Sequence, residues 1–296
     1  CTDEMLHNQD YFYQSNTTNS AYRPRLVVTD VTGFTVSASS SPAIGGTVTG
    51  GGLFQSGQTC TLTATPNTAY GYTFVRWSGG SVDNSTSNPV SFAVTADASI
   101  SAIFQAPPGC IDVTNYAELK TAIQSQAVAG NTIRVHSGTY TMPTQDNKLS
   151  LNNAGSVGAA ITVMGVGASR PIMTTSGQNI DRGFFYSNAS NSNWVFDNLE
   201  FQGIHDAVNG NAAASYILGD NVTFRNCRIH DCDQGLTSST DASGTLVEFC
   251  EIHMCGSDVF FNYSHLMYMQ DASLTVRGCW LHDAYGGMCF KSRCAS

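Results

Sequence analysis

Four segments in the second half of the chain share one alternation of apolar and polar residues. They start at Phe196, Phe224, Val247 and Val276, so that successive starts lie 23 to 29 residues apart. Each segment has two short β-like runs separated by a polar corner such as Arg225-Asn226. Irregular repeats of this length are typical of a solenoid, in which every turn buries its apolar face against the next. The pattern therefore predicts a stack of short strands.

The alternation also sorts the side chains into columns, because successive strand residues point to opposite faces. Cys227, Cys250 and Cys279 fall in one inward column, and Cys232 and Cys255 fall in another. Other repeats carry aliphatic residues at these offsets, so we interpret the cysteines as small buried apolar residues, stacked at the ~4.8 Å spacing of strands. Adjacent strands come close to the Cα separation of a disulfide, which leaves occasional bridges open.

Residues 31–104 follow a different pattern of short strands and glycine turns, which includes Gly50-Gly-Gly52, Cys60-Thr-Leu-Thr-Ala64, Tyr70-Gly-Tyr-Thr-Phe74 and Trp77-Ser-Gly-Gly80. This segment resembles the bacterial repeat domain related to the internalin B-repeat. The resemblance implies a small, all-antiparallel, β-grasp-like spacer or binding module, with Cys60 as a buried thiol. Trp77 and Tyr72 are either core residues or a sugar platform, and we favour core packing. Residues 105–109, which contain two prolines, are expected to form a stiff linker.

The third unit, residues 110–296, opens with an Asn115-Tyr-Ala-Glu118 capping box. Apolar residues at helical spacing follow to about Val128, and then come Gly130-Asn-Thr-Ile-Arg-Val135 and Gly138-Thr-Tyr140. This entrance resembles that of right-handed parallel β-helices of the pectate lyase-like superfamily, in which a short helix caps the stack. The expected fold class is therefore all-β, with a small antiparallel domain followed by a parallel β-helix of about seven turns.

Composition and charge agree with a secreted β-rich protein. Only 12% of the residues are charged, and 28 are glycine, which suits many tight corners. The net charge of −9 argues against nucleic acid or an anionic membrane surface as the main partner. An acidic polymer remains a suitable partner if the chain offers a local basic cluster or a cation such as calcium.

The first residues, Cys1-Thr2-Asp3-Glu4, resemble the start of a mature bacterial lipoprotein, in which the first cysteine carries the lipid. The resemblance implies lipidation of Cys1, a tether over residues 1–30 and a location on the outer surface of a bacterium. The chain has no run of 18 apolar residues. A lipid anchor is thus the expected contact with a membrane.

Candidate catalytic residues lie close to the C-terminus. Lys291 and Arg293 are rare basic residues on one face of one short segment, and we expect His265 and Tyr268 one coil earlier. The segment resembles a stretch of uncharacterised secreted β-helix proteins that reads Gly-His-x-x-Lys-Ser-Arg, although Met288 or a neighbour stands where the second His would be. A polysaccharide lyase needs a base for the proton next to a uronate carboxylate and cations for the developing charge. We expect Lys291 as base or cation, Arg293 as carboxylate clamp, and His265 and Tyr268 as base and acid partners.

Two further groups are candidate metal sites. His230, His253 and His282 share one repeat offset, which predicts stacked imidazoles at an exterior corner without a carboxylate in each register. Asp231, Asp233 and Asp258 supply oxygen ligands of the kind that calcium prefers, although aspartates also occur at corners for their turn geometry.

Two classes of function remain open at this stage. The first is an enzyme of the cell surface that cleaves an acidic polysaccharide by β-elimination. The second is a surface adhesin or a filament subunit without catalytic activity, because a fold does not fix an activity. No cap follows Phe290-Lys-Ser-Arg293, so we expect either further coils beyond Ser296 or self-assembly through this end.

Overall fold

The structure, a computed structural model, describes residues 33–177, 180, 182–259, 261 and 264–294. Cys1 and the tether expected over residues 1–30 lie outside this part of the chain. The chain divides into two compact units, Cys1–Gln105 and Ala106–Ser296. Among the described residues, none belongs to a helix long and apolar enough to cross a membrane.

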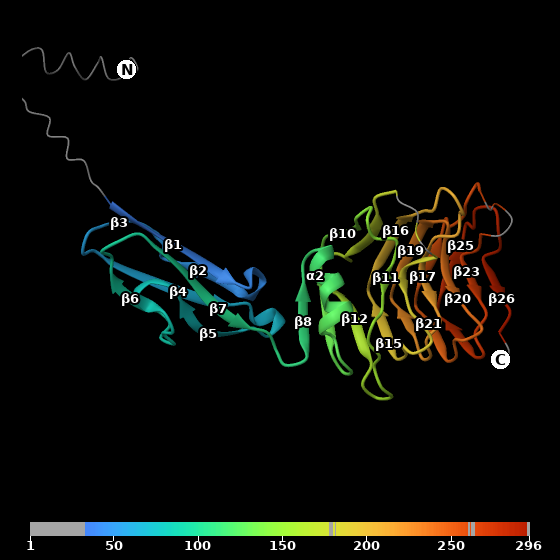
Figure 1. Cartoon of the computed structure of the whole chain (residues 1–296), viewed down its shortest axis with the longest axis horizontal. Helices are drawn as coiled ribbons and strands as arrows, with labels where there is room; N and C mark the ends of the chain where they lie inside the picture. The colour runs from blue at the N-terminus through green and yellow to red at the C-terminus, as the bar shows by residue number, and fades with distance from the viewer. Residues whose placement is uncertain (1–32, 178–179, 181, 260, 262–263, 295–296) are drawn as a thin grey trace, which may run out of the picture. The chain divides into compact units, whose positions relative to one another are not determined.

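The first unit is a β-domain of two sheets, with strand orders β3-β1-β7-β5 and β2-β4-β6 (Figure 1). All strand pairs are antiparallel except one: β1 and β7 run parallel. This pair corrects the expectation of an entirely antiparallel domain. The strands are β1 (Gly33–Ser41), β2 (Gly46–Thr49), β3 (Gly52–Gln55), β4 (Thr59–Pro66), β5 (Thr73–Ser78), β6 (Val90–Ala93) and β7 (Ala98–Gln105), with short helical turns η2 (Ala43–Gly45), η3 (Thr68–Tyr70) and η4 (Gly80–Val82).

The core of this domain contains the residues that the alternation selects. Cys60 and Trp77 are fully buried, and Tyr72 is 3% exposed. The indole Nε1 of Trp77 donates a hydrogen bond to the carbonyl oxygen of Ser87 at 2.8 Å. Trp77 and Tyr72 are therefore core residues, and the sugar-platform interpretation is wrong.

The second unit begins with a strand and a capping helix. β8 (Cys110–Val113) leads into α2 (Tyr116–Thr121), which continues as one π-helical turn, η5 (Ala122–Gln126). The Asn115 side chain accepts a hydrogen bond from the backbone N–H of Glu118 at 3.0 Å, as the capping box predicts. Leu119 and Ile123 point into the apolar interior and have no exposed surface, so the helix closes this end of the stack.

Three parallel sheets form the rest of this unit (Figure 1). One sheet has seven strands in the order β24-β21-β18-β15-β12-β9-β8, and the other two have six each, in the orders β10-β13-β16-β19-β22-β25 and β11-β14-β17-β20-β23-β26. From β9 onward every coil contributes one strand to each sheet, and β8 adds a seventh strand to the first sheet, which makes the unit a parallel β-helix, as predicted. The remaining strands are β9 (Thr132–His136), β10 (Thr139–Met142), β11 (Leu149–Ser150), β12 (Ile161–Val166), β13 (Ile172–Thr175), β14 (Gly183–Tyr186), β15 (Trp194–Asp197), β16 (Glu200–Ile204), β17 (Ala213–Ile217), β18 (Thr223–Arg225), β19 (Arg228–Cys232), β20 (Gln234–Ser238), β21 (Thr245–Glu248), β22 (Glu251–His253), β23 (Met267–Met269), β24 (Leu274–Arg277), β25 (Trp280–His282) and β26 (Phe290–Ser292).

The predicted cysteine column lies in the interior. Cys227 and Cys250 are buried, and Cys279 is half-buried in the last coil. The Cys250 thiol donates a hydrogen bond to the carbonyl oxygen of Glu248 at 3.4 Å, and its interaction with the Cys227 thiol is the main cause that raises the pKa of Cys250 to about 12. All cysteines of the described residues are free thiols. Sulfur therefore packs here as an apolar atom, and the stack is held without bridges among these residues.

Asparagine forms the tight corner between two of the sheets. Asn198 and Asn226 adopt positive φ values of 55° and 53°, which asparagine tolerates better than most residues. The Asn226 side chain also donates to a carboxylate oxygen of Asp197 in the preceding coil at 3.0 Å. These corners keep the strands of successive coils in register, which holds the outward side chains in fixed rows.

Candidate functional site

The candidate site lies on the outer face of the sheet that runs from β11 to β26. Strand pairing aligns one outward residue from each coil of this sheet. Three members of this row are tyrosines, and lysine ends it. The row consists of Ser150, Tyr186, Tyr216, Thr237, Tyr268 and Lys291.

The structure brings together the four residues that the sequence proposed for catalysis. Tyr268 pairs with Lys291 across β23 and β26. The Lys291 Nζ lies 4.9 Å from the centre of the Tyr268 ring, and the Arg293 Cζ lies 5.6 Å from it. Both cations thus lie over the same aromatic ring, an arrangement in which the ring quadrupole attracts positive charge.

His265 lies behind this group, and it is only 2% exposed. Its ring centre is 5.7 Å from that of Tyr268, and its Nδ1 accepts a hydrogen bond from the Met288 backbone N–H at 3.0 Å. Burial, and then the charge of Lys291, lower the pKa of His265. A neutral, buried imidazole of this kind supports Tyr268 from below, and a ligand on the outer face meets Tyr268 first.

A close approach of two chain segments creates this buried setting. A Cβ atom on Gly287 would overlap the carbonyl oxygen of Ser264 and lie 2.9 Å from the His265 Nδ1. Only glycine therefore lets the segment that leads into β26 lie against His265. The same contact places the Met288 N–H on the imidazole, although the resemblance noted above has a second histidine near this position.

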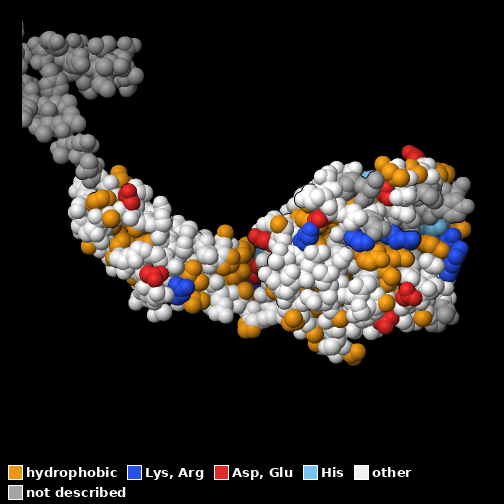
Figure 2. Space-filling model, in the orientation of Figure 1, with side chains coloured by type: hydrophobic (Ala, Val, Ile, Leu, Met, Phe, Trp, Pro, Cys, Tyr) orange, Lys and Arg blue, Asp and Glu red, His pale blue; other side chains and the backbone are white. Residues whose placement is uncertain are grey.

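The charges of this face differ from those of the rest of the β-helix. On the other sheets, Arg225, Arg228 and Arg277 are paired with carboxylates. Within the described residues, no carboxylate lies within ion-pair distance of Lys291 or Arg293. Basic side chains form a row across the β-helix in Figure 2. A protein with a net charge of −9 thus presents a locally basic face, which suits an anionic ligand.

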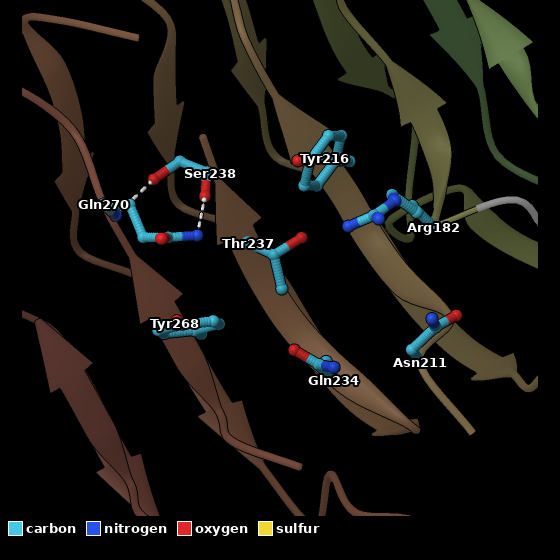
Figure 3. A pocket seen from close by; sticks show the side chains of 8 residues that line it. All are labelled: Arg182, Asn211, Tyr216, Gln234, Thr237, Ser238, Tyr268 and Gln270. Atoms are coloured by element: carbon cyan, nitrogen blue, oxygen red, sulfur yellow. Dashed lines mark hydrogen bonds between the residues drawn. The ribbon is translucent and has the colours of Figure 1, made fainter. Parts of the chain in front are cut away.

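The same face contains residues that the sequence analysis missed. Arg182, just before β14, places its Cζ 5.1 Å from the centre of the Tyr216 ring. Together with Gln234 and Tyr268, these residues line a hollow of ≈ 120 Å³, whose side chains are shown in Figure 3. A signal for it exists: Tyr186, Tyr216 and Tyr268 each stand at the same outward position of their coils. The repeats that start at Phe196, Phe224, Val247 and Val276 belong to the other two sheets, so their alternation does not reveal this row.

The histidine column is also present, but its place differs from the expectation. His230, His253 and His282 lie within strands and not at a corner, with ring centres 5.1 and 4.8 Å apart. Carboxylates accompany them, which the sequence pattern did not reveal: Glu200 is 2.9 Å from the His230 Nε2, and Glu251 is 3.5 Å from the His282 Nε2. The column is thus a half-buried ladder of imidazoles and carboxylates.

The three aspartates considered for calcium do not form one ligand set. Both carboxylate oxygens of Asp233 are occupied, one by the His205 Nδ1 and the other by two backbone N–H groups. Asp231 is exposed beside His205, and Asp258 accepts a hydrogen bond from the Tyr285 hydroxyl at 2.8 Å. Over the part of the chain that the structure describes, no three His, Cys, Asp or Glu side chains are grouped to hold a metal ion. The calcium expectation therefore gains no support from these residues.

Comparisons with known proteins agree with the two units. The model of the divergent InlB B-repeat domain matches residues 36–108, and that of the right-handed β-helix region matches residues 173–296. With the sheets described above, these matches show the expected fold class: a mainly antiparallel β-domain and a right-handed parallel β-helix. A search of curated proteins gives no match.

Solved structures with a similar fold include three lyases. Pectate lyase Pel9A has a TM-score of 0.45 and 19% identity, over 68% of this chain and 45% of its own. An alginate lyase from Paenibacillus sp. str. FPU-7 has a TM-score of 0.45 and 14% identity, over 56% of this chain and 57% of its own. A rhamnogalacturonan lyase has a TM-score of 0.41 and 16% identity, over 54% of this chain and 53% of its own. The chain spans about half the length of these proteins.

Proposed function

We propose that this protein binds an acidic polysaccharide on the outer face of the β11–β26 sheet and cleaves it by β-elimination at Lys291. One observation carries the proposal: Lys291 and Arg293 stand over the same Tyr268 ring, without a carboxylate partner among the described residues. On a rigid sheet, an amine and a guanidinium at fixed positions supply a base and a charge clamp. An anionic polymer is the ligand that such a face attracts.

The chemistry assigns one role to each exposed group. Lys291 first releases its own proton to solvent, and its neutral amine then removes the proton from the carbon next to the uronate carboxylate, while Arg293 pairs with that carboxylate as negative charge develops. A carbon–carbon double bond then forms, and the bond from the adjacent carbon to the glycosidic oxygen breaks. The Tyr268 hydroxyl gives its proton to the departing oxygen. Lysine gains one proton and tyrosine loses one, so the step balances.

His265 has a positioning role in this proposal. Its burial and its hydrogen bond from Met288 keep it away from a ligand on the outer face. Because its pKa is lowered, it is neutral at neutral pH and adds no positive charge behind Tyr268. Of the two residues expected as base and acid partners, Tyr268 keeps the role of acid in this proposal, and His265 does not act as a base.

The test uses the protein incubated separately with polygalacturonate, alginate and glycosaminoglycans. New unsaturated ends are followed by their ultraviolet absorbance. Lys291→Ala should remove the activity and leave the fold intact, because a partly exposed strand residue costs little stability when truncated. The matched control is Arg170→Ala, which removes an exposed positive charge at the turn between β12 and β13, two strands of the other sheets. Full activity of Lys291→Ala would refute the assigned role.

The same proposal places the protein outside the cell, on the outer surface of a bacterium. The low share of charged residues, 12%, and the net charge of −9 support this location. The adhesin alternative makes a different prediction for the same experiment. An adhesin would bind the polymer through the basic face and release no unsaturated ends with any of the three polymers.

A further inference from the structure

The hollow around Arg182 has the features of a built binding site. Arg182 is an exposed cation for which no carboxylate partner lies among the described residues. Across the hollow, the Oε1 of Gln234 is buried, and no described residue donates a hydrogen bond to it. A buried acceptor without a donor lowers stability unless a ligand or water supplies the missing bond.

The backbone at Arg182 is strained in a way that directs its side chain. Its φ is 70°, a region that few residues other than glycine, asparagine and aspartate adopt. Such strain persists where the surroundings impose it, and it is frequent at binding sites. The guanidinium lies over Tyr216 as a result, and Figure 3 shows it reaching from the β14 side toward Thr237 on β20.

We propose that this hollow is a second sugar subsite, which binds a uronate unit of the same polymer that is cleaved at Lys291. Arg182 pairs with the carboxylate of that unit, and a sugar hydroxyl donates to the Gln234 Oε1. The rings of Tyr216 and Tyr268 flank the hollow and offer apolar faces to the sugar. This inference rests on the proposed polysaccharide function and specifies its substrate.

The spacing of the strands defines what kind of ligand can use both places. From Tyr216 on β17 to Lys291 on β26, the row crosses β20 and β23, which makes three strand spacings. At ~4.8 Å per spacing, the backbone positions of Tyr216 and Lys291 are about 14 Å apart. One sugar ring cannot touch both. The favoured ligand is therefore an oligomer that carries acidic units at both ends of this span.

The experiment compares binding and cleavage of oligogalacturonates, with a dimer and a hexamer as probes. Binding is measured by calorimetry in the Lys291→Ala background, where no turnover consumes the probe. Arg182→Gln should weaken binding of the hexamer roughly tenfold, which corresponds to about 1.4 kcal/mol. Arg170→Gln removes the same charge at an exposed turn and should leave binding unchanged. Gln234→Glu places a negative charge in the hollow and should also weaken hexamer binding.

Kinetics of the otherwise unaltered protein provide the second readout. Arg182→Gln should raise KM for the hexamer roughly tenfold and leave kcat unchanged, because Arg182 does not touch the reacting atoms. The dimer is too short to reach from Lys291 to Arg182, so its KM should not respond. Circular dichroism and thermal unfolding show whether each variant is folded.

The two proposals fail in different ways. Hexamer binding that depends on Arg182, without any cleavage, supports the subsite and refutes the lyase. Cleavage of the hexamer with the same KM in Arg182→Gln supports the lyase and overturns the subsite. Equal weakening by Arg182→Gln and Arg170→Gln also overturns it, because a general charge effect would then explain the loss. Other uronate polymers replace the probe if the screen above identifies them as the substrate.

Discussion

The imidazole ladder should make the β-helix sensitive to acid, and His253 is the residue to perturb. Its ring is sandwiched between those of His230 and His282, and the residue is 7% exposed. Burial is the main cause that lowers the pKa of His253, and the positive charges of the two neighbouring rings and Arg228 act in the same direction. Glu251 opposes them. Protonation of His253 is therefore less favourable in the folded protein than in the unfolded chain.

The sign of the pH effect follows from this difference. Below the ordinary value of 6.5, the unfolded chain binds a proton that folded His253 does not. As the pH decreases below this value, the free energy of unfolding falls by about 1.4 kcal/mol for each pH unit, until the pKa of His253 in the folded protein is reached. His205 acts in the opposite direction, because its hydrogen bond with Asp233 raises the pKa of His205. Its stabilisation is present at low pH and is lost as the pH rises.

His253→Phe isolates the effect, because a phenyl ring keeps the stack and cannot bind a proton. Urea unfolding of the protein and the variant is compared at about pH 7.5 and about pH 5. When the pH is lowered from the first value to the second, the free energy of unfolding should fall more for the unsubstituted protein than for His253→Phe. His205→Asn is the control, and its difference from the protein should have the opposite sign. A free-energy difference between the protein and His253→Phe that is the same at both pH values would refute the reasoning.

Three further predictions concern the stack and its corners. Phe224→Ala should destabilise the β-helix by about 3–5 kcal/mol in urea unfolding, because the side chain is fully buried and stacks on Phe196 at 4.8 Å. Asn226→Ala should cost on the order of 1–3 kcal/mol in the same assay, through its positive φ and its lost hydrogen bond, and Asn226→Gly should cost less. Iodoacetamide added to the native protein should label the exposed Cys289 long before the buried Cys250, as peptide mass spectrometry can verify, and equal labelling would contradict the interior column.

The architecture could be predicted because each coil repeats the same inward positions. Cys227, Cys250 and Cys279 share one offset, and parallel in-register strands turn a shared offset into spatial contact. The cluster of Lys291 with Tyr268 was expected on another ground, the resemblance of this segment to other β-helix proteins and a separation of one coil. In each case, spacing along the chain corresponds directly to a position in the stack.

Features that depend on turns and on pairing between distant segments could not be predicted in this way. The hollow beside Arg182 depends on a backbone conformation that no alternation encodes. The carboxylate of Glu251 reaches the histidines from a neighbouring row of the same sheet. The parallel pairing of β1 with β7 joins the two ends of the first domain, and strand propensity does not specify direction.

The regular stacking of coils makes the β-helix a ruler. The positions of Arg182 and Lys291 along the stack are separated by a whole number of coils, and each coil adds the thickness of one strand, ~4.8 Å. Gain or loss of one complete coil between them would preserve the interior columns, because every coil presents the same inward face to its neighbours. It would nevertheless change the distance between the two basic groups by the thickness of one strand, ~4.8 Å. Coil number can thus set the length of polymer that is measured, while the chemistry at either end stays the same.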